Sequence, residues 1–476
     1  MRRTLSALIA LSLAACSGGG GSGSVVAGGG SSGGSSPTPT PTTAGCTLRE
    51  RQDWAAAQLN EWYLFPETLP ASLSPTGYAD LSSYVDALTA TARAQGKDRY
   101  FTYVTSIAEE NAYYNSGASA GFGFRLFLSG NRLFSAETFE GTSALTAGID
   151  RGTEILAIGT DASTLRNVSD ILAASGSAGL TDALGPNTAG TTRTLRVTDA
   201  AAGTRVVTLS KTDYTLTPVS ARYGARIIDD GGHRVGYVNL RTFINTAETP
   251  LRDAFASFKA AGVTEIIIDV RYNGGGLVSI AELMGNLLGA NRSASDVFDK
   301  MTFRSSKASN NSTAYFAAQP QSIAPTRIAF IGTSSTASAS ELVAAAMLPY
   351  LGNNLALVGG NTYGKPVGQI AVDKAACDDR FRIIAFALQN RDNQGAYYTG
   401  LASLIPNSCK AADDIAYPLG DAREASTRAA LDFIQGKACT PITASTAAKS
   451  AQAAIEREPL TPAAPSVPQR DVPGLF

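Results

Sequence analysis

The chain has 476 residues, of which 44% are hydrophobic, and its 39 basic residues nearly balance 40 acidic ones. This length allows roughly two to four domains, and the composition is that of a globular protein rather than a disordered one. A balanced charge provides no basic surface of the kind that binds nucleic acid. We therefore expect neither a nucleic-acid partner nor a strongly acidic one.

The first 45 residues predict export and attachment rather than a folded domain. Residues 1–15 begin with a positive charge and continue with a short apolar run, which is typical of a secretory signal peptide and too short to span a membrane. The letters "LAAC" resemble the lipobox of bacterial lipoproteins, which implies a lipid on Cys16; an ordinary signal peptide with a chance cysteine is the alternative. Residues 16–45 would combine this lipidated cysteine with a flexible Gly/Ser/Pro/Thr linker. We expect a lipid-anchored cell-envelope protein that faces the periplasm or the cell surface, and Ser17 favours the outer membrane.

Four cysteines remain for the body of the protein: Cys46, Cys377, Cys409 and Cys439. An even number of cysteines in an exported chain predicts two disulfide bonds. Three pairings are possible, and we favour Cys377–Cys409 with Cys46–Cys439, the second of which would join the start of the body to its end. Zinc is disfavoured because the chain has no C-x-x-C and a single histidine, His233. We expect no metal.

Residues 46–115 predict a helical N-terminal domain. Apolar side chains recur at helical spacing in the first part of the chain body, at Leu81, Tyr84, Val85 and Leu88. The preceding stretch "LRERQDWAAAQLNEWYLF" has a similar pattern. We therefore expect helices over most of this region.

Residues 116–215 change to short strands. The runs "GFGFRLFL" and "NRLFSAETF" are separated by an "SGN" turn and predict a hairpin. A strand "EILAIG", a helix "NVSDILAAS" and a strand pair "TRTLRVTD" and "TRVVTLSK" follow. "SAGFGFRL" and "AGIDRGTEILAIGT" resemble a PDZ domain, with Thr153 where aspartate is usual. This resemblance implies capture of a free polypeptide C-terminus by a carboxylate-binding loop at Gly121, Phe122, Gly123 and Phe124.

Residues 216–440 predict a mixed α/β domain. Apolar runs typical of buried strands, "TEIIIDV", "RIAFIGT" and "LALVGG", alternate with the helical patterns "PLRDAFASFKAAG", "SIAELMGNLLG" and "SASELVAAAML". This alternation predicts βαβ units around a parallel sheet. Residues 441–476 are rich in alanine and proline, and we expect an irregular tail with one possible helix. The predicted fold class is a multidomain α+β and α/β protein.

A candidate nucleophile lies in "GTSSTASASELVAAAM" at residues 332–347, which holds Ser334, Ser335, Ser338 and Ser340. A serine needs an adjacent base, and His233 is far away in the sequence, so a Ser-His-Asp triad is disfavoured. A neutral lysine is the base in Ser-Lys dyads. Lys365 follows the strand "LALVGG" as Ser338 follows "RIAFIGT". If these two strands are neighbours in a parallel sheet, both residues lie on the same edge.

"TASASELVAAAM" and "GGNTYGKPVGQ" resemble the signatures of the carboxyl-terminal processing peptidases, also called tail-specific proteases. The resemblance implies that Ser338 is the nucleophile, Lys365 the general base and Gln369 the residue that positions the lysine. It also implies a ClpP/crotonase-like peptidase core over residues 216–440. The sequence departs from the family pattern at Pro366, where glycine is usual.

An oxyanion hole is expected from two backbone regions. The N–H of Ala339 would open the helix after the nucleophile, where the helix dipole favours negative charge. "EIIIDVRYNGGGLVSIAEL" is similar to a glycine-containing signature of the same family, and Gly275 or Gly276 would supply the second donor because glycine permits close approach of a substrate. The "NGGG" turn is equally compatible with a tight connection between strand and helix.

We therefore expect a serine endopeptidase that cleaves polypeptides with free C-termini through an acyl-enzyme and needs no cofactor. One alternative is a non-catalytic, PDZ-containing, peptide-binding lipoprotein of the same fold. Another is a carbohydrate- or lipid-binding lipoprotein. The presence of Ser338, Lys365 and Gln369 together favours the enzyme.

Overall fold

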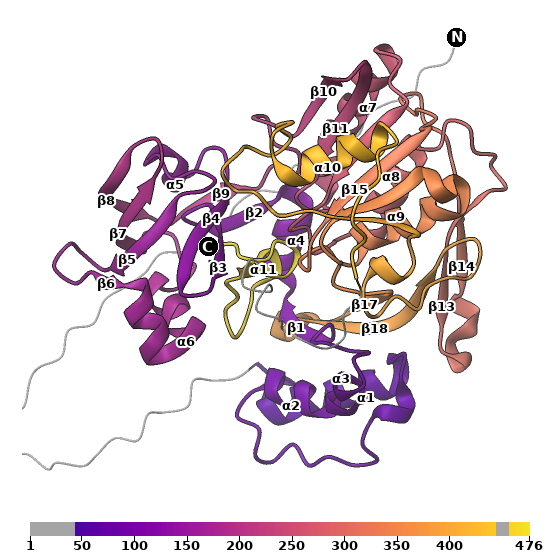
Figure 1. Cartoon of the computed structure of the whole chain (residues 1–476). Coiled ribbons are helices and arrows are strands. Elements are labelled where there is room, and N and C mark those ends of the chain that lie inside the picture. Colours follow the sequence, from indigo (N-terminus) through magenta and orange to yellow (C-terminus); the bar gives the residue numbers. More distant parts are fainter. Residues whose placement is uncertain (1–42, 444–456) are drawn as a thin grey trace, which may run out of the picture. The chain divides into compact units, whose positions relative to one another are not determined.

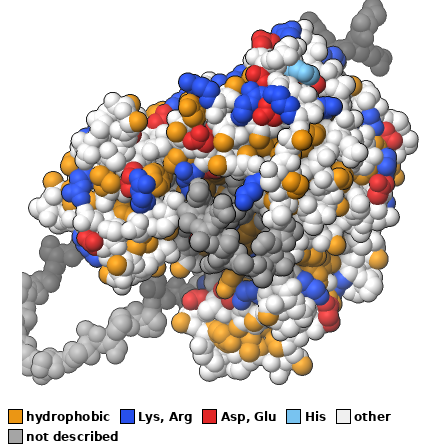
Figure 2. Space-filling model, in the orientation of Figure 1, with side chains coloured by type: hydrophobic (Ala, Val, Ile, Leu, Met, Phe, Trp, Pro, Cys, Tyr) orange, Lys and Arg blue, Asp and Glu red, His pale blue; other side chains and the backbone are white. Residues whose placement is uncertain are grey.

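The computed structural model describes residues 43–443 and 457–476. The predicted signal peptide (1–15) and the predicted lipidation site Cys16 lie outside the described residues. Residues from Thr43 to Phe476 form one compact unit. Among the described helices, none is both long and apolar enough to cross a membrane. On the face drawn in Figure 2, positive and negative side chains are interspersed rather than gathered into a patch of one sign.

A six-stranded sheet forms the centre of the predicted α/β region, in the order β10-β11-β12-β15-β16-β19 (Figure 1). All neighbours from β11 to β19 are parallel, and β10 is antiparallel to β11. The strands span β10 Ala225–Asp230, β11 His233–Asn239, β12 Glu265–Asp269, β15 Arg327–Gly332, β16 Leu355–Gly359 and β19 Asn407–Lys410. The apolar runs form these strands because a parallel sheet buries both of its faces.

Helices cover both faces of this sheet. Ile266 and Ile268 of β12 point to a core shared with α7 (Glu248–Ala260), α8 (Val278–Leu287) and α9 (Ala339–Leu351). Ile267 points to the other face, where it packs with α10 (Ala425–Ile434). This alternation follows from the period of two in a strand. The predicted βαβ organisation is confirmed.

A second sheet has the order β1-β18-β13-β14, with β17 paired to β18. Its strands are β1 Tyr103–Ser106, β13 Val297–Phe303, β14 Ser312–Tyr315, β17 Val367–Lys374 and β18 Asp379–Gln389. The predicted N-terminal helices are α1 Leu48–Trp62, α2 Leu81–Leu88, α3 Ala90–Ala94 and α4 Ile107–Ser116. Side chains of α1 and α2 share a core with Phe381 and Ile383 of β18, so these helices rest on this sheet. Strand β1 was not predicted, and it forms because it pairs with β18.

A third sheet, in the order β20-β3-β4-β5-β7-β8 with β6 paired to β5, contains the predicted hairpin and strand pair. Its elements are β3 Phe124–Ser129, β4 Arg132–Thr138, β5 Glu154–Gly159, β6 Arg166–Asn167, β7 Thr192–Asp199, β8 Gly203–Ser210, β20 Glu458–Pro459, α5 Ser143–Thr146 and α6 Val168–Leu184. A separate strand pair joins β2 (Ala118–Gly121) and β9 (Thr212–Thr215). The tail contributes β20 to this sheet and forms a helix, α11 (Val467–Asp471), which agrees with the one helix considered there.

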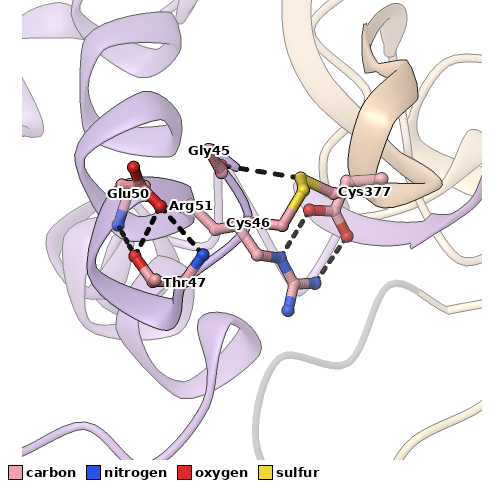
Figure 3. The surroundings of a disulfide bond; sticks show 7 residues. Gly45, Cys46, Thr47, Glu50, Arg51 and Cys377 are labelled. Carbon is pink, nitrogen blue, oxygen red and sulfur yellow. Dashed lines mark hydrogen bonds and ion pairs between the residues drawn. A yellow bond between two sulfur atoms is a disulfide. The ribbon is translucent and has the colours of Figure 1, made fainter. Parts of the chain in front are cut away.

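Both predicted disulfide pairings are wrong. Cys46 bonds to Cys377, and Cys409 bonds to Cys439, with Cα–Cα distances of 5.5 and 5.3 Å. The pairings depend on tertiary packing, which the sequence pattern does not show. Helix α1 packs on β18, and this brings Cys46 to Cys377 in the connection between β17 and β18 (Figure 3). The chain after α10 returns along β19, where the Lys410 N–H donates to the Thr440 carbonyl.

Candidate active site

The ends of two neighbouring strands bring the candidate nucleophile and base to one edge of the central sheet. Strands β15 and β16 pair in parallel up to Gly332 and Gly359. Beyond the strands, the Tyr363 N–H donates to the Thr336 carbonyl at 2.9 Å, so the two loops stay paired. The adjacency that the sequence predicted for the loops of Ser338 and Lys365 is confirmed.

Ser338 occupies a strained backbone position at the start of α9. Its φ of 57° and ψ of −117° place a non-glycine residue outside the ordinary regions. Such geometry persists only where neighbours impose it, and it is common at functional sites. Here the Ala337 N–H donates to the Asn273 carbonyl, and the Ser338 N–H donates to the Glu341 carboxylate at 3.0 Å. The serine is thus presented on a sharp turn between strand and helix.

Glu341 joins the two loops through one buried carboxylate. It accepts backbone N–H groups of Ser338 at 3.0 Å, Gly364 at 2.7 Å and Lys365 at 2.7 Å. Burial raises the pKa of Glu341, while these hydrogen bonds act in the opposite direction. Sequence reasoning placed Glu341 only in the first helical turn. One feature of the sequence could have indicated a buried role for Glu341: it is the one charged residue in a mostly apolar helix.

Lys365 is held by the residue that was predicted to position it. Its Nζ donates to Gln369 Oε1 at 3.1 Å and lies 5.0 Å from the centre of the Phe101 ring. The Gln369 amide donates in turn to the Phe101 carbonyl, so Phe101 is a further site residue that the sequence did not indicate. Burial lowers the pKa of Lys365 to about 8, against the opposing influence of Asp471 and Asp98. Ser338 and Lys365 are both among the described residues, and Ser338 Oγ and Lys365 Nζ are not hydrogen-bonded to each other.

The glycine loop packs directly against Ser338. A Cβ atom on Gly275 would lie 2.7 Å from Ser338 Cβ, and its φ is +116°. The close approach therefore requires glycine. Gly276, with φ of +135°, lies against the backbone of Phe243.

The predicted oxyanion donors differ in their availability. In the described structure, the Ala339 N–H at the start of α9 has no hydrogen-bond acceptor. The Gly275 N–H donates to Asn273 Oδ1 at 2.9 Å, so this donor is engaged. The neighbouring Gly274 N–H donates to the Asp471 carbonyl of the tail at 2.8 Å. The Gly276 N–H likewise has no acceptor among the described residues, so Ala339 and Gly276 are the predicted donors that remain unengaged.

A cavity of about 620 Å³ opens beside these residues. Its wall includes Lys365, Gln369 and Gly274 from the site, and Arg470 and Asp471 from the tail. This volume is in the range of sites that hold drug-sized ligands. The cavity is thus wide enough for a short stretch of polypeptide, and part of its wall is the chain's own tail.

The predicted carboxylate-binding loop binds the last residue of the sequence. The N–H groups of Gly123 and Phe124 donate to the backbone oxygen of Phe476 at 2.9 and 3.3 Å. A Cβ atom on Gly121 would lie 2.6 Å from the Phe476 carbonyl carbon, so this loop also requires glycine at close approach. Phe122 shares a buried cluster with Phe476.

His233 lies at the opposite end of the central sheet. It begins β11, whereas Ser338 follows the carboxyl end of a parallel strand. Its Nδ1 lies 2.7 Å from Oε2 of Glu265, which begins β12. This position excludes the histidine from a triad with Ser338.

Comparison with known proteins gives a family match at the site. Residues 234–394 match the model of peptidase family S41. A chloroplastic C-terminal processing peptidase of Tetradesmus obliquus is 27% identical over 186 residues, which are 38% of this chain and 38% of that protein. The chloroplastic carboxyl-terminal-processing peptidase 2 of Arabidopsis thaliana is 28% identical over 174 residues, which are 34% of this chain and 30% of that protein. The chain thus spans about a third of the length of these curated relatives.

A solved structure shares the fold over a larger part of the chain. A Bacteroides fragilis protein described as an S41 protease matches with a TM-score of 0.61 and 21% sequence identity. The match covers 80% of this chain and 97% of that one. It shows a common mixed α/β fold with several sheets.

Proposed function

We propose that the protein, whose residues 234–394 match the model of peptidase family S41, is a serine endopeptidase with a Ser-Lys dyad. Ser338 is the nucleophile, Lys365 the general base and Gln369 its positioning residue. The observation that supports this most strongly is the Glu341 carboxylate, which accepts the backbone N–H groups of both dyad residues. One buried side chain thereby fixes nucleophile and base relative to each other.

The first half of the proposed reaction forms an acyl-enzyme. Neutral Lys365 accepts the hydroxyl proton of Ser338 as the serine oxygen attacks the scissile carbonyl carbon. The Ala339 N–H, at the start of α9, stabilises the resulting oxyanion. The C–N bond then breaks, the leaving amine takes the proton from Lys365, and the acyl group remains on Ser338 as an ester.

The second half restores the enzyme. Lys365 accepts a proton from a water molecule, whose oxygen attacks the ester carbonyl. The tetrahedral intermediate collapses, the C–O bond to Ser338 breaks, and the serine oxygen recovers a proton from Lys365. A lysine with a pKa of about 8 serves both halves, because it can accept and return a proton near neutral pH.

The third sheet is proposed to select the substrate as a PDZ domain. Its loop at Gly121–Phe124 would hold the free C-terminus of a polypeptide, and the edge of β3 would add the substrate as a strand. This edge already accepts strand pairing, because β20 and the last tail residues bond to it. From the sequence of residues 1–45, we also propose that the enzyme is anchored in the cell envelope by a lipid on Cys16.

Peptide cleavage by matched variants tests the activity. The wild type should cleave unstructured polypeptides that have a free C-terminus. Ser338→Ala and Lys365→Ala should each reduce kcat/KM by at least about 1000-fold, because dyad members act as a unit. His233→Ala, at the far end of the sheet, serves as the control and should retain wild-type activity. Absence of cleavage by the wild type would favour the non-catalytic peptide-binding protein instead.

A further inference from the structure

Strand β3 pairs with β4 along one edge, and two stretches of the chain's own tail bond to its other edge. The Leu126 N–H donates to the Gly474 carbonyl at 2.7 Å, and the Phe476 N–H donates to the Phe124 carbonyl at 3.0 Å. Further along the same edge, the Leu460 N–H donates to the Leu126 carbonyl at 2.9 Å. Figure 1 shows the C-terminal end of the chain beside β3 and α11. The tail therefore makes the backbone pairing that an added peptide strand would make.

Phe476 occupies an apolar pocket at the end of this groove. The residue is 2% exposed, and its cluster includes side chains from the loop and from α6, namely Phe122, Val168, Ile171 and Leu184. Its backbone oxygen accepts the N–H groups of Gly123 and Phe124. A groove with this pocket suits a ligand whose last side chain is large and apolar. A charged last side chain would lose its hydration in this apolar cluster.

The same tail reaches the peptidase site. The Asp471 carbonyl accepts the Gly274 N–H at 2.8 Å, next to the glycine that packs on Ser338. Arg470 and Asp471 form part of the cavity wall that contains Lys365. Between groove and site, Val472 and Leu475 are buried in one cluster with residues of the body. Docking in the groove and contact with the site are thus made by one continuous segment.

We propose that residues 457–476 are an intramolecular ligand that fills the peptide groove and covers the peptidase site, and that a polypeptide ending in a large apolar residue displaces them. The covering of the site rests on the proposed peptidase function, whereas competition in the groove is independent of it. A tethered ligand acts at an effective concentration of about 1 mM. For an intrinsic Kd of the tail segment of about 10 µM, a competing peptide therefore binds about 100-fold more weakly while the tail is docked.

Peptide binding in the Ser338→Ala background tests the competition without any catalysis. The probe is a fluorescent peptide with the sequence of residues 470–476 and a free carboxylate. Phe476→Asp should expel the tail and tighten probe binding by at least about tenfold. Val206→Asp is the matched control, because Val206 is 52% exposed on β8 at the opposite edge of the same sheet. It should leave the affinity unchanged.

A second measurement needs no tail substitution and covers the case in which Phe476→Asp fails to fold. Hydrogen exchange is followed in the Ser338→Ala protein with the same peptide at saturation. The amides of Val472, Gly474, Leu475 and Phe476 in the protein should exchange faster, since the tail leaves the groove. The amidated peptide, and a peptide ending in Asp, should produce no change.

Equal probe affinity in Ser338→Ala and its Phe476→Asp derivative would overturn the proposal. So would tail amides that stay protected while the peptide binds, or absence of binding to either protein. None of these results depends on whether Ser338 cleaves peptides, so they remain distinct from a failure of the proposed activity.

Discussion

At the scale of a single residue, the proposed chemistry depends on Lys365. Its side chain is partly buried, and burial favours the neutral form that can accept a proton. Gln369 accepts a hydrogen bond from Nζ and orients it without adding a negative charge. Ser338 contributes the complementary feature, a strained backbone that exposes its hydroxyl at a helix start.

The pKa of Lys365 predicts the pH dependence of activity. Because only neutral lysine accepts the serine proton, kcat/KM should rise with pH, pass its midpoint near 8 and then level off. At pH 6 the activity should be lower by about 100-fold, since two pH units separate it from that pKa. Gln369→Leu removes an acceptor that favours the charged form, so the midpoint should move to lower pH. A flat profile between pH 6 and 9 would contradict the role of Lys365.

Glu341 predicts a loss of both stability and activity. In Glu341→Gln, an amide NH₂ replaces one acceptor oxygen and faces backbone N–H donors, which leaves at least one donor unsatisfied. The free energy of unfolding should fall by about 1–3 kcal/mol, and kcat should fall more than KM changes. Glu248→Gln, on the exposed side of α7, is the control and should cost under about 0.5 kcal/mol. Urea unfolding and steady-state kinetics provide the two readouts.

At the scale of elements, the sequence predicted the strands and helices that have strong periodic patterns. The runs before Ser338 and Lys365 formed neighbouring parallel strands, and the family resemblance placed Lys365 beside Gln369. Contacts made across elements were missed. The reach of Glu341 to the Lys365 loop and the pairing of Cys46 depend on tertiary packing, which no local pattern records.

Peptide mass mapping and measurements of the free energy of unfolding can test the two observed disulfide bonds. Non-reducing peptide mapping should recover Cys46 linked to Cys377, and Cys409 linked to Cys439. Replacing the first pair with serine should cost about 5 kcal/mol and the second about 3.5 kcal/mol, because the first closes the longer loop. Loop separations of 331 and 30 residues set this order. Peptides that link Cys46 to Cys439 would show that the structure is wrong here.

A buried ion network links the third sheet to the central one. Glu137 of β4 contacts Arg125 of β3 at 3.2 Å and Arg241, which follows β11, at 2.6 Å. All three side chains are at most 2% exposed. Burial alone would raise the pKa of Glu137, but the two arginines lower it. Its contribution to stability is therefore present above about pH 4.5 and is lost as the pH falls below that value.

Removal of the central charge should be costly. Glu137→Gln leaves the buried Arg125 without a carboxylate and Arg241 with Glu140 alone. The free energy of unfolding at pH 7 should therefore fall by about 3–5 kcal/mol. Glu154→Gln is the control on the same sheet, because its partner Arg132 is 58% exposed. It should cost under about 1 kcal/mol. Equal effects of the two substitutions in urea unfolding would contradict the structural role of the network.

At the scale of the whole molecule, the tail was the largest departure from expectation. Residues 441–476 are rich in alanine and proline and offer no period that would predict a strand or a docking site. Nevertheless Phe476 is buried and Asp471 reaches the glycine loop. The family resemblance located the loop at Gly121–Phe124. It could not indicate that Phe476 binds there, because that contact joins two segments far apart in the sequence.

The most direct test of the central claim is covalent labelling of the nucleophile. A fluorophosphonate forms a bond between phosphorus and the activated serine oxygen, with fluoride leaving, and peptide mass mapping locates it. We expect the label on Ser338 in the wild type and more rapidly in Phe476→Asp, with labelling strongly reduced in Lys365→Ala. A label on any other serine, equal labelling in Lys365→Ala, or no labelling of either active protein would contradict the Ser338–Lys365 assignment.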